Sequence, residues 1–125
     1  GYKCVITGSS MGHRCGYVGL NEPTDQMQND SYSLDVDVHG GITYGERRSD
    51  YPVESKNLFW LGFDCAHSCD GKDWELVKEL NDETTYKTLY QIENMYHSEA
   101  PVRTSDYVEW QLKSLVDQLV EMGVE

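Results

Sequence analysis

The hydrophobic pattern of this chain changes period near Asp70, and that change is the feature that most restricts its fold. Before Asp70, apolar residues alternate with polar or small ones, as in the stretch NLFWLGFD at 57–64. A period of two residues indicates β-strands. After Asp70, apolar residues recur at steps of three and four, which indicates helices. Strands followed by helices favour an α+β fold, in which helices pack on one face of an antiparallel sheet.

Four segments before Asp70 carry strand patterns, with polar loops rich in turn-forming residues between them. In the third segment, Leu34, Val36 and Val38 alternate with polar residues, so we expect them on one face of a strand. The fourth segment is predicted to place Phe59, Leu61 and Phe63 on one face and Trp60, Gly62 and Asp64 on the other. The predicted strands are 2–7, 15–20, 32–44 and 57–64, and the predicted loops are 8–13, 21–31 and 46–57.

Three segments after Asp70 carry helical patterns. Asp73 is predicted to cap a helix over 73–82, and a second helix is predicted over 84–98. The strongest pattern is the third, over 105–122, where one apolar stripe recurs at steps of four and three and where Ser105 or Asp106 can cap the start. The members of that stripe are Val108, Leu112, Leu115, Leu119 and Met122.

These patterns predict one domain over residues 1–125. We expect an antiparallel sheet of about four to five strands in the N-terminal two-thirds of the chain. Two to three helices, including a C-terminal helix, are expected to pack on one face of that sheet.

The charge of the chain excludes some partners. With 22 acidic and 10 basic residues its formal net charge is −12, and such a surface repels a nucleic-acid backbone. We therefore expect no direct nucleic-acid binding. The chain has no apolar run long enough for a membrane span, and its first residues lack a signal-peptide pattern, so we expect a cytoplasmic protein whose four cysteines are reduced.

Three short stretches, 12–20, 38–45 and 59–70, each couple a histidine with glycines or a cysteine at or beside a predicted strand. If those strands are neighbours, the stretches converge on one pocket. The residues predicted to be catalytic are His39, Asp64 and His67, in which Asp64 orients a histidine that acts as a base. The residues predicted to bind a ligand are His13, Arg14, Tyr17 and Tyr44, with the tyrosines stacking on a ring and the arginine meeting its charge. The alternative is that each histidine only hydrogen-bonds a turn.

Metal binding is a second reading of the same stretches. Cys65, His67 and Cys69 are residue types that suit zinc, and His13 with Cys15 shows the same one-residue gap. These spacings differ from the usual C-x₂₋₄-C and H-x₃₋₅-H patterns, and small buried cysteines also act as hydrophobic core residues. We therefore assign no metal ligand and leave the cofactor open.

Taken together, the stretches resemble a family of small phage and prophage proteins. That family carries the motifs HRCGYVG, VHGG[IL]TY and W-x-GFDCAH-x-x-D, which match residues 13–19, 38–44 and 60–70. The closing helix of the family is matched by Arg103, Asp106, Tyr107, Val108, Leu115, Gln118 and Leu119. The chain departs from the family in the loop 21–31, which lacks a His-Pro pattern, at Cys69, and in an added segment at 84–100.

The resemblance implies a phage origin, and phage accessory proteins of this size often blunt host defence. We expect a counter-defence protein of the host-cell cytoplasm that binds a small nucleotide-like ligand and either sequesters or hydrolyses it. The alternatives are an acidic inhibitor that mimics nucleic acid toward a host defence protein, a zinc-assisted hydrolase, and a structural component of the virion. A homo-oligomer is also compatible with the sequence.

Overall fold

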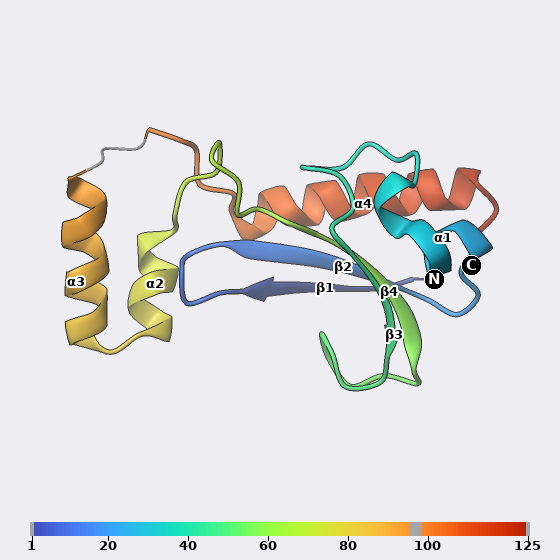
Figure 1. Cartoon of the computed structure of the whole chain (residues 1–125), viewed down its shortest axis with the longest axis horizontal. Helices are drawn as coiled ribbons and strands as arrows, with labels where there is room; N and C mark the ends of the chain where they lie inside the picture. The colour runs from blue at the N-terminus through green and yellow to red at the C-terminus, as the bar shows by residue number, and fades with distance from the viewer. Residues whose placement is uncertain (1, 96–98, 125) are drawn as a thin grey trace.

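A four-stranded antiparallel sheet forms the centre of the protein, with the strand order β1-β2-β4-β3 (Figure 1). The computed structural model describes residues 2–95 and 99–124. The strands are β1 (Lys3–Gly8), β2 (Arg14–Leu20), β3 (Tyr44–Arg48) and β4 (Leu58–Asp64), and the helices are α1 (Asp25–Asp30), α2 (Trp74–Leu80), α3 (Glu83–Asn94) and α4 (Ser105–Glu121). A short 3₁₀ turn, η1 (Ser31–Ser33), follows α1. The α+β class, the antiparallel sheet and the C-terminal helix are confirmed.

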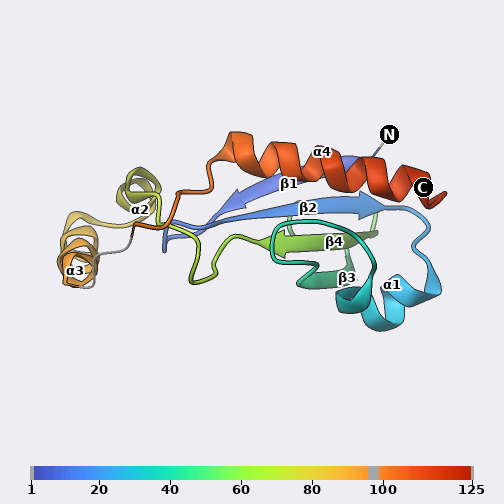
Figure 2. The same ribbon diagram turned by 90° about the horizontal axis from the view of Figure 1, so that it is seen from above.

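Helix α4 covers one face of the sheet, lying along β1 and β2 (Figure 2). The apolar stripe of α4 is buried against the predicted apolar face of β4, and both belong to one hydrophobic core. The buried members are Phe59, Leu61 and Phe63 from β4 and Val108, Leu112, Leu115 and Leu119 from α4. Met122 is 45 % exposed because α4 ends at Glu121, so its predicted place in the stripe is wrong.

The opposite face of the sheet carries aromatic side chains. Trp60 is fully buried there, and its indole N–H donates to the carbonyl of Arg48 at 3.3 Å. Strand register places Tyr17, Gly62 and Tyr44 in one row across β2, β4 and β3. Gly62 leaves room for the Tyr17 ring, since a Cβ atom at Gly62 would lie 2.6 Å from Tyr17 Cδ1.

Helices α2 and α3 pack against each other beyond one end of the sheet (Figures 1 and 2). Asp73 caps α2 as predicted, because its Oδ1 accepts the backbone N–H groups of Glu75 and Leu76. Thr104 caps α4, one residue before the two predicted candidates. The predicted helix 84–98 corresponds to α3, and its residues 96–98 lie outside the described part of the chain.

The predicted strand over 32–44 is wrong for most of its length. Residues 34–43 run as an irregular segment beside α4, and only Tyr44 belongs to a strand. Two glutamines of α4 supply the hydrogen bonds that a neighbouring strand would otherwise supply. Gln118 bonds both the N–H and the carbonyl of Asp37, at 2.7 and 2.8 Å, and Gln111 Oε1 accepts the N–H of His39 at 2.9 Å.

Two predicted loops contain regular structure. The loop 21–31 holds α1, where Thr24 caps the helix and Met27 is buried in the core. The loop predicted over 46–57 begins only after Arg48, because the preceding residues pair with β4. Both segments are rich in turn-forming residues. A short helix or an edge strand with one buried face adds few apolar residues, so no clear periodic pattern marks either element. No helix in the ranges 2–95 and 99–124 has the length and hydrophobicity of a membrane span.

Candidate functional site

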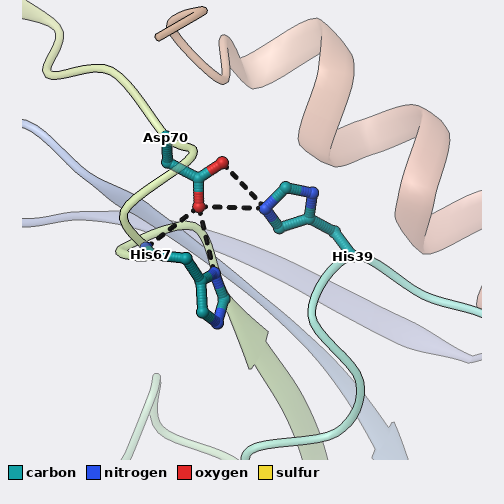
Figure 3. Close-up of side chains that lie close together, drawn as sticks. All are labelled: His39, His67 and Asp70. Atoms are coloured by element: carbon teal, nitrogen blue, oxygen red, sulfur yellow. Dashed lines mark hydrogen bonds and ion pairs between the residues drawn. The ribbon is translucent and has the colours of Figure 1, made fainter. Parts of the chain in front are cut away.

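The carboxylate of Asp70 lies at the centre of a cluster just beyond the end of β4 (Figure 3). Its Oδ1 accepts a hydrogen bond from Arg103 Nε at 2.9 Å and lies 2.9 Å from His39 Nε2. Its Oδ2 lies 3.0 Å from His39 Nε2 and from His67 Nδ1, and it accepts the backbone N–H of His67 at 3.1 Å. The two imidazoles therefore share one carboxylate.

Each side chain of the cluster is held by a different part of the fold. A turn sets Asp70, whose N–H donates to the carbonyl of His67 at 2.9 Å. Gln111 of α4 fixes the backbone of His39, and the Tyr107 hydroxyl lies 2.7 Å from His39 Nδ1. The guanidinium of Arg103 stacks on the Tyr107 ring, 4.8 Å from its centre. We name this set, His39, His67, Asp70, Arg103 and Tyr107, the Asp70 cluster.

Gly40 has no side chain, and this leaves the space that the His67 imidazole occupies. The φ angle of Gly40 is +69°, a backbone conformation that residues other than glycine rarely adopt. A Cβ atom at Gly40 would lie 2.4 Å from His67 Cε1, so the imidazole occupies the space that any larger residue would fill. The glycine after His39 thus serves the second histidine of the cluster.

The Asp70 carboxylate is ionised. Its side chain is fully shielded from solvent. Burial alone would raise the pKa of Asp70, but hydrogen bonds from His39, Arg103 and His67 outweigh burial and hold that pKa well below its usual range. The hydrogen bond to Asp70 in turn raises the pKa of Arg103. The ion pair between Asp70 and Arg103 therefore anchors the cluster.

His67 is the imidazole that reaches solvent. Its side chain is 34 % exposed, compared with 9 % for His39. Its outer nitrogen, Nε2, lies 3.6 Å from Asp64 Oδ1. Asp64 is itself held by the backbone N–H of Ala66, which donates to Oδ1 at 3.1 Å. A ligand that approaches from solvent would therefore meet His67 and Asp64 first.

The structure brings together the three residues predicted to be catalytic, His39, Asp64 and His67, and separates them from the four predicted to bind a ligand. Arg14 pairs with Asp73 at 2.7 Å and touches the cluster only through the carbonyl of Arg103, at 3.1 Å.

Tyr17 and Tyr44 pack edge to face with 5.5 Å between ring centres, in an aromatic group that also includes Tyr51. Tyr17 is only 5 % exposed, and its hydroxyl is hydrogen-bonded to that of Tyr51 at 2.7 Å. His13 lies in the β1–β2 connection, and its Nδ1 is buried without a hydrogen-bond partner in the described part of the chain.

Sequence reasoning missed three members of the cluster as site residues. Asp70 could have been found, because it follows His67 by three residues, a spacing at which a turn brings two side chains together. Tyr107 and Arg103 gave no comparable signal. Their contacts with His39 and Asp70 span 68 and 33 positions, so no local pattern relates them.

The cluster can perform two kinds of chemistry. When Asp70 accepts the Nδ1–H of His67, the Nε2 atom carries a lone pair that can take a proton, as in a carboxylate-oriented general base. His39, His67 and Asp70 also offer one ligand atom each, and all three atoms lie within 4.8 Å of one another, so the same residues could hold a metal ion.

The fold and the cluster define a small acidic α+β protein with two histidines centred on one buried aspartate. No family model matches the chain, and neither the curated proteins nor the solved structures include one with significant similarity to it.

Proposed function

We propose that this protein binds a small, phosphate-bearing, nucleotide-like molecule at the Asp70 cluster and hydrolyses it. One observation carries the proposal: two imidazoles converge on one buried, ionised carboxylate, and one of them is open to solvent. Burying a charge carries a large desolvation cost, which the hydrogen bonds from three side-chain partners offset here. Perturbed carboxylates of this kind concentrate at functional sites.

The arrangement supports acid–base chemistry. Asp70 orients His67 so that Nε2 can take a proton from a water molecule. The oxygen of that water then bonds to phosphorus, the bond from phosphorus to the leaving oxygen breaks, and the leaving oxygen takes the proton that His67 had accepted. Arg103, 22 % exposed at the edge of the cluster, supplies a positive charge toward a phosphate group.

The resemblance to phage proteins gives this proposal its biological setting. A phage protein that removes a nucleotide signal made by its host would blunt the defence that the signal activates. Either tight capture or hydrolysis achieves this result, and a single experiment distinguishes the two.

The experiment is a retention assay with the full chain. The protein is mixed with linear and cyclic mono- and dinucleotides, separated from free ligand, then denatured, and the released molecules are identified by mass spectrometry. A changed product supports the full proposal, and intact recovery supports binding but contradicts hydrolysis. Failure to retain or alter any of these nucleotides contradicts the proposal.

Matched variants locate the site. His67→Gln and His39→Gln should abolish retention and turnover, whereas Tyr44→Phe, in the separate aromatic group, should leave both unchanged. A far-ultraviolet circular dichroism spectrum and a melting curve check that each variant is folded. Equal losses in His67→Gln and Tyr44→Phe would place the ligand elsewhere.

A further inference from the structure

The charge of the Asp70 cluster poses a problem for an anionic ligand. Two carboxylates, those of Asp64 and Asp70, lie within 3.6 Å of His67 ring nitrogens, and within the Asp70 cluster as defined above Arg103 is the one residue with a fixed positive charge. A phosphate group placed against His67 would be repelled by both carboxylates. A cation bound between the cluster and the ligand would remove that repulsion.

We infer that His39, His67 and Asp70 form a binding site for one divalent transition-metal ion of the zinc class, with His39 Nε2, His67 Nδ1 and an Asp70 carboxylate oxygen as ligands. The inference extends the proposed function. The role of the ion rests on that function, but the binding of the ion does not. It differs from the zinc site considered in the sequence, because it uses no cysteine.

The distances fit a common ion. Both His39 Nε2 and His67 Nδ1 lie 3.0 Å from Asp70 Oδ2. Two ligand atoms that bind one zinc ion at about 2.0–2.2 Å are separated by roughly 3.0–3.5 Å at the usual coordination angles. The third pair, His39 Nε2 and His67 Nδ1, lies within 4.8 Å, so the two imidazoles would move toward each other as they bind the ion.

Every ligand also has an outer partner that fixes its orientation. Tyr107 faces the second nitrogen of His39 at 2.7 Å, and Asp64 faces the second nitrogen of His67 at 3.6 Å. Arg103 holds Oδ1 of Asp70, and Oδ2, which also accepts the backbone N–H of His67, is the oxygen that faces both imidazoles. Metal-binding histidines almost always donate their other N–H to an outer partner.

Proton positions are compatible with binding. A neutral imidazole that binds a metal through one nitrogen carries its proton on the other. His39 would move its proton to Nδ1 and donate to the Tyr107 hydroxyl, and His67 would hold its proton on Nε2 toward Asp64. His67 therefore acts as the base only in the ion-free protein, because Nε2 has no lone pair available when the ion is bound. Asp70 is already ionised and needs to release no proton.

The ligand set selects the class of ion. Two imidazole nitrogens with one carboxylate suit zinc and related transition metals, whereas magnesium and calcium prefer oxygen ligands. Three protein ligands leave a coordination position open, which is the arrangement of catalytic rather than structural zinc sites. An ion there would bind a phosphate oxygen or a water molecule on the side where His67 is exposed.

The test is zinc binding by the full chain, with no nucleotide present. Protein stripped with a chelator is titrated with Zn²⁺ in competition with a chromophoric chelator, and the titration is repeated with Mg²⁺. We expect one Zn²⁺ per chain and no competition by Mg²⁺. Failure of Zn²⁺ to bind with one-to-one stoichiometry would overturn the inference.

Variants assign the ligands. His67→Gln should weaken Zn²⁺ binding by about 100-fold or more, and Tyr107→Phe, which changes only an outer partner, by about 10- to 100-fold. His13→Gln and Cys69→Ser, which lie outside the cluster, should bind Zn²⁺ like the parent chain. Unchanged affinity in His67→Gln, or lost affinity in Cys69→Ser, would refute the assignment even if Asp70→Asn failed to fold.

Spectroscopy gives an independent readout. The Co²⁺-loaded protein should lack sulfur-to-cobalt charge-transfer absorption, and Zn²⁺ should shift the imidazole ¹⁵N resonances of His39 and His67 but not that of His13. A sulfur band would assign the ion to cysteine and overturn the inference. Nucleotide turnover that persists in excess chelator, with no Zn²⁺ binding, would support the proposed function and reject the metal site. Zn²⁺ binding without nucleotide retention would support the metal site and contradict the proposed function.

Discussion

The Nε atom of Arg103 lies 2.9 Å from Oδ1 of Asp70, whose side chain has no contact with solvent. This pair joins the turn after β4 to the residues that lead into α4. It compensates a buried charge around which both histidines of the cluster are arranged. The pair therefore links the stability of the fold to the geometry of the site.

Replacing Asp70 should destabilise the protein strongly. In metal-free Asp70→Asn, Arg103 loses its buried counter-charge and the histidines lose a shared acceptor, so we expect unfolding free energy to fall by about 3 kcal/mol. Urea denaturation followed by circular dichroism measures this change. Asp50→Asn is the matched control, because its ion pair with Arg48 is largely exposed and should contribute little. Similar effects in both variants would contradict the central role of Asp70.

Gly40 and Gly41 offer a paired test of how the His67 imidazole is positioned. Both have positive φ angles, +69° and +76°, so alanine at either should cost about 1 kcal/mol in backbone strain. Only a Cβ atom at Gly40 would collide with His67, since nothing lies within 4 Å of the corresponding position at Gly41. Gly40→Ala should therefore also abolish Zn²⁺ and nucleotide binding, whereas Gly41→Ala should retain both. Titration of each folded variant with Zn²⁺ and with nucleotide measures this difference. Equal binding by Gly40→Ala and Gly41→Ala would contradict the packing argument.

Asp73 should make the fold sensitive to acid. The hydrogen bond from Arg14 lowers the pKa of Asp73, so its ionised form is favoured in the folded state. The stabilisation is complete above the unfolded pKa of about 3.9 and is lost as pH falls through the lower folded pKa. Asp73→Asn keeps an N-cap residue but loses the charge, so its unfolding free energy should fall less steeply between about pH 5 and pH 2. Denaturant melts across that range measure the slope, and parallel curves for the two proteins would contradict the prediction.

Cys65 should resist thiol reagents while the protein is folded. Its side chain is fully buried, and burial, with a smaller contribution from the Asp70 charge, raises the pKa of Cys65 to about 12. The reactive thiolate is therefore scarce. Cys4 and Cys69 are exposed and should be alkylated before Cys65 when iodoacetamide is added at pH 8 and the sites are mapped by mass spectrometry. Cys65 should react only after urea is added, and rapid labelling of native Cys65 would contradict its burial.

Local periodicity was sufficient for much of the fold. The alternation of Phe59, Leu61 and Phe63 and the apolar stripe of α4 record which side of each element is buried, and these sides do meet in the core. Periodicity failed at 34–38, where the same alternation lies in a segment held by Gln111 and Gln118 rather than in a strand. An alternating pattern reports an extended backbone with one buried side, and it does not report which groups accept the hydrogen bonds.

The sequence by itself determined three of the four strands in part or in full, the helices after Asp70, their buried faces and the choice of His39, Asp64 and His67 as unusual residues, because these depend on neighbours along the chain. Only the tertiary structure decided which of the unusual residues meet. It joined the histidines to Asp70, Arg103 and Tyr107 and left Tyr17 and Tyr44 in a separate aromatic group. The physical reason is distance along the chain: Arg103 and Asp70 are 33 positions apart, and the fold brings them together where Gly71 and Val102 form a β-bridge just before α4.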